Sequence, residues 1–150
     1  MTLRLMDRST LPCLQELIRV NFAARDELYA AAGSVDDEGY RVICQRLADQ
    51  LAGHAAELQQ VVLANEGDPG DCGETYLTAE TLFNAVKCDR GEVGVIAAAE
   101  DCERRVRQRY NRAIESTSDL EVAGLLRRQC NNVEFGEHVL RSMARPTQPR

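Results

Sequence analysis

Acidic side chains and one histidine lie on helical stripes that are otherwise apolar. In the segment 34–65, apolar residues recur every three or four positions; His54 continues that line and Glu57 follows three residues later. In the segment 89–116, Glu100 and Glu103 occupy stripe positions where leucines would be expected. An ionised carboxylate in an apolar core is costly unless a positive charge compensates it. Several such groups at one level of a bundle would therefore share a cation.

Candidate ligands come from four separate helical segments. The last segment contributes Glu137, and the sequence leaves open whether Glu137 or the adjacent His138 points inward. The full set, in chain order, is Asp26, Glu27, His54, Glu57, Glu100, Glu103, Glu134, Glu137 and His138. Carboxylate oxygen and imidazole nitrogen suit iron or manganese, and zinc accepts them as well. The pattern predicts a metal centre, with a di-iron centre as one form of it.

Each candidate also has an interpretation without a metal. Glu100 and Glu103 stand four residues before Arg104 and Arg107, which is the spacing of ordinary ion pairs on one helix. His54 fits a core or boundary histidine with its hydrogen bonds satisfied. The acidic and histidine candidates of the first and last segments fit solvated helix faces. In this interpretation no cofactor is bound.

The elements that position these residues are helices. Tryptophan is absent and aromatic residues make up 5% of the chain, which favours helix over sheet. Ser9, the pair Ser34 and Asp37, the pair Asp89 and Glu92, and the pair Ser118 and Glu121 have the spacing of helix N-caps. With Gly and Pro as stop signals, the predicted helices span 9–33, 34–65, 78–87, 89–116 and 118–145.

The lengths of the connections predict the topology. Short links join the first two long helices and the last two, so each pair is antiparallel, whereas residues 66–88 form a long crossover with a short helix inside it. This connectivity predicts an all-α, ferritin-like antiparallel four-helix bundle made of two helical hairpins. The 150 residues suffice for a single domain, 1–150, with loose termini at 1–9 and 146–150.

Charge and cysteine usage narrow the partners and the compartment. The net charge of −6 leaves no basic stripe for phosphates, so neither nucleic acid nor an acidic membrane surface is expected as a partner. Without an apolar run of roughly 18 residues or an apolar leader, we expect a cytoplasmic protein. The six cysteines include no CxxC pair and fit small buried side chains; Cys72 and Cys88 are the candidates for exposed reactive thiols.

Four short stretches point to a known family. They are Leu14-Gln-Glu-Leu-Ile18, Ala56-Glu57-Leu58-Gln59, Gly67-Asp68-Pro69 with Gly73, and Glu100-x-x-Glu103 followed by Tyr110. In order and spacing the chain resembles, over about 11–141, an uncharacterised bacterial family of short ferritin-like four-helix proteins, a domain of unknown function. The resemblance implies inward carboxylates at Glu57, Glu100 and Glu103. The family usually has histidine where this chain has Glu137, and its first-helix acid corresponds to Asp26 or Glu27.

Two functions follow as hypotheses. The first is a metal-binding protein, an oxidoreductase acting on oxygen or peroxide or a metal-handling protein, in oxidative or metal stress. The alternative is a metal-free helical bundle that serves as a stress-related or protein-interaction module. A homodimer is compatible with an apolar patch on the crossover, formed by Tyr76, Leu77, Leu82, Phe83 and Val86.

Overall fold

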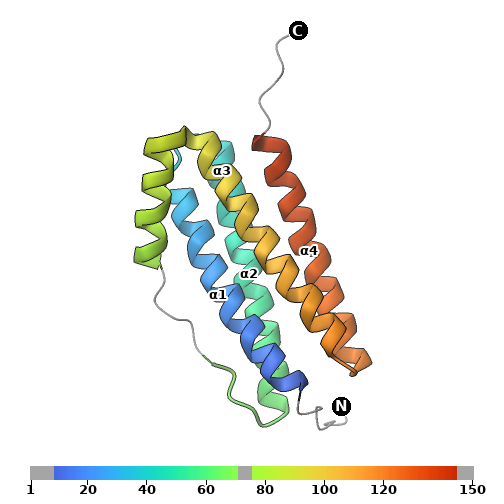
Figure 1. Cartoon of the computed structure of the whole chain (residues 1–150). Coiled ribbons are helices and arrows are strands. Elements are labelled where there is room, and N and C mark those ends of the chain that lie inside the picture. Colours follow the sequence, from blue (N-terminus) through green and yellow to red (C-terminus); the bar gives the residue numbers. More distant parts are fainter. Residues whose placement is uncertain (1–8, 71–75, 145–150) are drawn as a thin grey trace.

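Four helices make up the described part of the chain, residues 9–70 and 76–144, in a computed structural model (Figure 1). They are α1 (Thr10–Gly33), α2 (Glu38–Ala64), α3 (Tyr76–Ser116) and α4 (Leu120–Ala144). No strand occurs among these residues. The prediction of an all-α helical bundle is therefore confirmed. Cys72 and the predicted loose ends beyond residues 9 and 144 lie outside the described residues.

The helices pack side by side around one apolar core. α1 lies against α2 and α3, α3 lies against α4, and α2 and α4 approach each other less closely than these pairs. In Figure 1, α1 and α4 run upward, whereas α2 and the part of α3 that follows Gly91 run downward. Fully buried leucines and isoleucines from all four helices fill the centre, among them Leu28, Leu51, Ile96 and Leu126. None of the described helices is both long and apolar enough to cross a bilayer.

Two of the predicted N-caps are wrong by one to three positions. Asp37, not Ser34, caps α2, because its carboxylate accepts the Tyr40 backbone N–H at 3.0 Å. Ser34 ends α1 instead, where its hydroxyl donates to the Ala30 carbonyl at 2.8 Å. Asp119, not Ser118, caps α4 by accepting the backbone N–H groups of the residues two and three positions later. Aspartate accepts these hydrogen bonds as well as serine does, so spacing alone did not separate the alternatives.

Gly91 joins the predicted short helix and the predicted third long helix directly. It has φ 72° and ψ −170°, a conformation that side-chain-bearing residues rarely adopt, and the chain reverses direction there (Figure 1). The segment 76–90 packs back onto the bundle, and Phe83 is only 2% exposed. Phe83 thus belongs to the core and not to an exposed patch. Leu82 is exposed, and the side chains of Tyr76 and Leu77 lie outside the described residues.

The reversal at Gly91 is tied to the turn between α1 and α2. Glu92 was expected to cap its own helix, but its carboxylate accepts the backbone N–H groups of Asp36 at 2.6 Å and Asp37 at 3.0 Å. Lys87 pairs with Asp36 at 3.5 Å, and the Ser34 hydroxyl lies 3.2 Å from the side-chain oxygen of Asn84. These polar contacts therefore join the α1–α2 turn to the α3 residues around Gly91.

Four of the described cysteines behave as expected for small side chains inside helices. Cys44, Cys102 and Cys130 are buried and Cys13 is half-buried, while Cys88 is exposed, as its position beside a helix start suggested. None of the described cysteines forms a disulfide.

Replacing Gly91 with alanine tests the reversal. A Cβ at Gly91 would meet no neighbour, so the expected loss of about 1 kcal/mol in the free energy of unfolding comes from the positive φ alone. Gly53→Ala is the matched control, because Gly53 lies inside α2 with open space around it and should gain about 0.5–1 kcal/mol. Urea unfolding measures both, and equal effects of the two substitutions would contradict the strain at Gly91.

Candidate functional site

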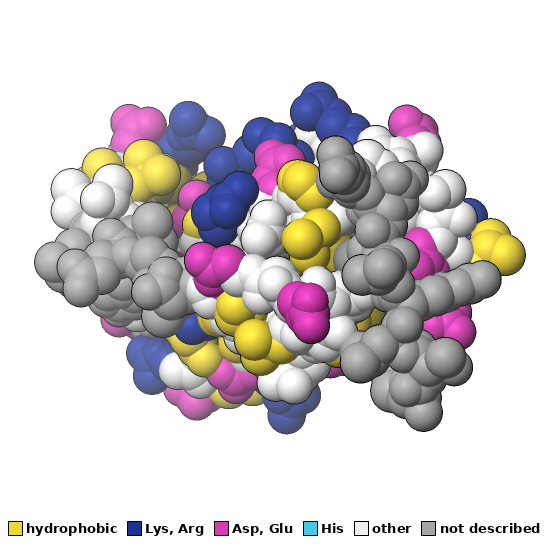
Figure 2. All heavy atoms as spheres, turned by 90° about the horizontal axis from the view of Figure 1, so that it is seen from below, with side chains coloured by type: hydrophobic (Ala, Val, Ile, Leu, Met, Phe, Trp, Pro, Cys, Tyr) yellow, Lys and Arg dark blue, Asp and Glu magenta, His cyan; other side chains and the backbone are white. Residues whose placement is uncertain are grey.

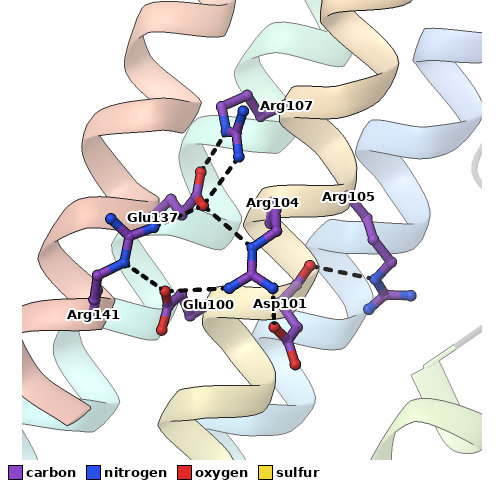
Figure 3. Close-up of polar contacts among 7 residues, drawn as sticks. All are labelled: Glu100, Asp101, Arg104, Arg105, Arg107, Glu137 and Arg141. Carbon is purple, nitrogen blue, oxygen red and sulfur yellow. Dashed lines mark hydrogen bonds and ion pairs between the residues drawn. The ribbon is translucent and has the colours of Figure 1, made fainter. Parts of the chain in front are cut away.

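Glu137 is the centre of a charged cluster between α3 and α4. Its side chain is 3% exposed and meets three arginines: Nε of Arg107 at 2.6 Å, Nη2 of Arg141 at 3.0 Å and Nε of Arg104 at 3.5 Å (Figure 3). Arg104 and Arg107 come from one turn of α3, and Arg141 follows Glu137 by one turn of α4. Burial alone would raise the pKa of Glu137. The hydrogen bond from Arg107 and the charges of the three arginines outweigh burial and hold that pKa below its usual value.

Glu100 belongs to the same cluster. Its carboxylate meets Nε of Arg141 at 2.8 Å and Nη2 of Arg104 at 3.4 Å, so both arginines bridge Glu100 and Glu137 (Figure 3). Arg104 also pairs with Asp101 at 2.8 Å. The expected pair between Glu100 and Arg104 is present, with Arg141 as a second partner that the helix spacing of α3 could not show.

Glu103 has no partner of this kind. It is fully buried, and neither carboxylate oxygen has a hydrogen-bond partner among the described residues. The alternative in which Glu103 pairs with Arg107 is wrong, because Arg107 turns to Glu137 across the helix interface. Burial, with a smaller contribution from the charge of Glu137, raises the pKa of Glu103 from 4.5 to about 8. At neutral pH Glu103 is therefore a protonated, neutral acid.

A second, uncharged polar layer connects all four helices about two turns from Glu103. Asn21 of α1 donates to the Tyr110 hydroxyl of α3 at 2.9 Å, and Tyr110 donates to the Gln129 side-chain oxygen of α4 at 2.7 Å. The Gln129 amide nitrogen lies 3.3 Å from the backbone oxygen of His54 in α2 and donates to it. Each helix thus contributes one polar group to this chain of hydrogen bonds.

His54 belongs to this polar layer, and Glu57 lies at its edge. The His54 ring lies edge-on to Tyr110, with ring centres 6.4 Å apart, and its Nε2 is 3.3 Å from the Asn132 amide nitrogen. Burial lowers the pKa of His54 to about 4, against the opposing charge of Glu57, so the imidazole is neutral. Glu57 is half-buried; one carboxylate oxygen pairs with Arg128 at 2.7 Å and the other accepts from the Gln129 amide at 3.3 Å. Gln129 thus meets Glu57 as well as the His54 backbone, whereas the His54 ring faces Asn132 and Tyr110.

The remaining candidates lie apart from both layers. Asp26 is buried and pairs with Arg25 at 2.8 Å, and Glu27 pairs with Arg105 at 3.0 Å on the α1–α3 side. Glu134 and His138 are exposed on α4. The open question about the last helix is thus answered: Glu137 points inward and His138 points to solvent.

The donors do not fit a shared metal ion in this arrangement. Glu100, Glu137 and Glu57 already bind guanidinium groups, which a cation would have to displace. Glu103 has free oxygens, but they lie seven residues along α3 from Tyr110 and the His54 layer, about 10 Å at helical rise. No three Asp, Glu, His or Cys side chains of the described residues converge as metal ligands. Metal binding therefore stays a prediction that this side-chain geometry does not support.

Neither a protein-family model nor a curated protein matches this chain.

The sequence identified the buried acidic side chains but not most of the side chains that bind them. Arg141 follows Glu137 by four residues, a spacing that could have identified the pair. Asn21 and Gln129 lie on apolar stripes, where any polar residue signals a buried hydrogen bond. Asn132 gave no such signal, because it lies at the edge of the α4 stripe.

Removing the Glu137 carboxylate tests the charged cluster. Glu137→Ala leaves Arg107 without its carboxylate and removes the buried member of the cluster, while Arg104 and Arg141 keep Glu100, and we expect a loss of about 3 kcal/mol in the free energy of unfolding. Glu134→Ala, one turn away on the same helix but exposed, should change it by less than about 0.5 kcal/mol. Chemical denaturation compares the two, and a similar small effect of both would show that the cluster contributes little.

Proposed function

We propose that this chain is a metal-free, ferritin-like helical bundle that acts as a protein-interaction module. The observation that carries the proposal is the set of three guanidinium groups around Glu137 and Glu100, the carboxylates that a metal centre would need. The chain supplies its own positive charges there, so an additional cation would gain little electrostatic energy.

The ferritin-like part of the proposal rests on connectivity. α1 and α2 form one antiparallel pair. The part of α3 that follows Gly91 forms another with α4 (Figure 1). Segment 76–90 runs upward beside the bundle before α3 turns down at Gly91, so α2 and the long part of α3 run in the same direction. One long return between two helical hairpins is the arrangement that ferritin-like bundles use.

A role without catalysis is supported by the burial of the groups that could react. Glu103 and Tyr110 are fully buried, and His54 has its ring between Asn132 and Tyr110 inside the bundle. A substrate could reach none of the three without separating helices. General acid or base catalysis requires hydrogen-bond contact with the reacting group, which these side chains do not offer.

The outer side of α4 is the surface that we assign to a partner, a second copy of this chain. Leu120 is 82% exposed and Phe135 is 69% exposed, more than any other large apolar side chain described. Arg127 and Glu134 lie between them, seven residues apart on one side of the helix, and neither forms an ion pair within the described ranges. Two α4 helices that cross antiparallel about a two-fold axis would place each Arg127 near the partner copy's acidic position 134.

Elemental analysis tests the metal-free part. Protein purified without chelator, incubated with Fe²⁺ or Mn²⁺ and then gel-filtered should hold less than about 0.1 ion per chain, because arginines occupy the carboxylates. The Glu100→Ala/Glu103→Ala variant and the exposed control Glu115→Ala/Glu121→Ala should give the same low value. About one or two ions per chain, lost only from the first variant, would contradict the proposal and establish a metal site.

Sedimentation equilibrium tests the interaction surface. The parent chain should dimerise with increasing concentration, whereas Phe135→Ser should remain monomeric and equally folded, since its ring is exposed in one copy. Leu63→Ser is the control, because Leu63 is 52% exposed at the end of α2, away from α4. A parent chain that stays monomeric at its highest soluble concentration would contradict the dimer.

A further inference from the structure

The Glu103 carboxyl lies where α2, α3 and α4 meet. A Cβ placed on Gly136 of α4 would lie 2.9 Å from Oε2 of Glu103 and 2.8 Å from a methyl group of Leu47 of α2. The missing side chain at Gly136 therefore lets the α4 backbone pack directly against the acid and against α2. In this position the carboxyl is surrounded by backbone and apolar carbon.

The ionisable groups around Glu103 offer it no positive charge. Cys44 of α2 is a buried thiol whose pKa is raised to about 12, mainly by burial and also by Glu103. Glu137 of α4 adds a negative charge, and the arginines bound to Glu137 make no hydrogen bond to Glu103. On its own helix, Cys102 and Tyr110 are buried and neutral. Toward α1, Glu27 and Arg105 pair with each other.

These surroundings favour the neutral, protonated form of Glu103 over the carboxylate. A protonated carboxyl with no partner costs one or two hydrogen bonds with water, but a carboxylate there would also lack a counter-ion. After losing its proton to solvent, Glu103 must reach water or one of the nearby guanidinium groups. α2 and α4 approach each other less closely than α1 approaches α2 and α3 or α3 approaches α4, so their boundary offers the least costly path among these neighbours.

We propose that Glu103 is a proton-controlled latch: while neutral it keeps α4 packed on α2, and when it loses its proton the boundary between these helices opens. The opening exposes Leu47 and Cys44 to water, while α1 and its contact with α3 stay closed. The ion pairs of Glu137 with Arg104 and Arg107 still hold α4 to α3 and limit how far α4 moves.

The direction of the pH effect on stability follows from the change in protonation. The pKa of Glu103 is raised from 4.5 to about 8 in the fold, so its contribution to the free energy of unfolding is complete below pH 4.5 and is lost as pH rises to about 8. The lowered pKa of His54 has the opposite effect, a loss as pH falls from 6.5 toward 4. Between pH 6.5 and 8 the decline therefore comes from Glu103 and not from His54.

Thiol labelling of Cys44 tests the latch, with mass spectrometry resolving the modified cysteines. The ratio of Cys44 labelling rates in the parent and in Glu103→Gln cancels the pH dependence of the thiol itself. We expect a ratio near one at pH 6.5 and about tenfold at pH 9, where most Glu103 side chains would be ionised. Cys102, buried toward α1, is the internal control and should keep a ratio near one.

A second variant and a second measurement keep the test decisive. Glu103→Leu should give the same result as Glu103→Gln and replaces it if the amide variant does not fold. Hydrogen exchange of the parent alone, corrected for its intrinsic pH dependence, should increase above pH 8 in α2 and α4 but not in α1. A Cys44 ratio that does not change with pH, or a parallel increase at Cys102, would overturn the proposal, the latter because it indicates global unfolding.

Discussion

An ionised carboxylate buried between two helices must meet positive charge at the place where it is buried, and Glu137 imposes this requirement on α3 and α4. Arg104 and Arg107 can both reach it only if α3 presents one particular face at one particular height. The same placement brings Glu100 within reach of Arg141. The charged cluster therefore fixes how α3 and α4 lie against each other, which apolar contacts alone leave less well determined.

The rest of the polar interior depends on that placement. Once the arginines bind Glu137, Glu103 has no counter-ion and stays buried as a neutral acid against Gly136. Seven residues further along α3, Tyr110 links α1 to α4 through uncharged hydrogen bonds. Figure 2 shows the bundle from below, where basic and acidic side chains are interspersed on the end that faces the viewer.

Helix spacing predicted which acids point inward, but not what neutralises them. Glu137 and Glu103 were identified because they continue apolar stripes, and burial confirms both. Arg107 binds Glu137 and not Glu103 because of the way α3 is rotated against α4, and the spacing of residues within one helix does not reveal that rotation. Likewise, the free oxygens of Glu103 depend on a close approach of the α4 backbone at Gly136. Spacing within a helix therefore predicts where the helices lie and which of their faces are buried. The contacts between helices can be found only once the fold is known.

The most direct test is a ¹³C NMR titration of the glutamate side-chain carboxyl carbons, assigned with Glu103→Gln and Glu137→Gln. We expect Glu103 to titrate with a pKa of about 8 and Glu137 to titrate below its usual value of 4.5. Added Mn²⁺ or Zn²⁺ should leave both curves unchanged. A Glu103 signal that titrates near 4.5, or that shifts or broadens with stoichiometric metal, would contradict the claim that protons and arginines neutralise these acids.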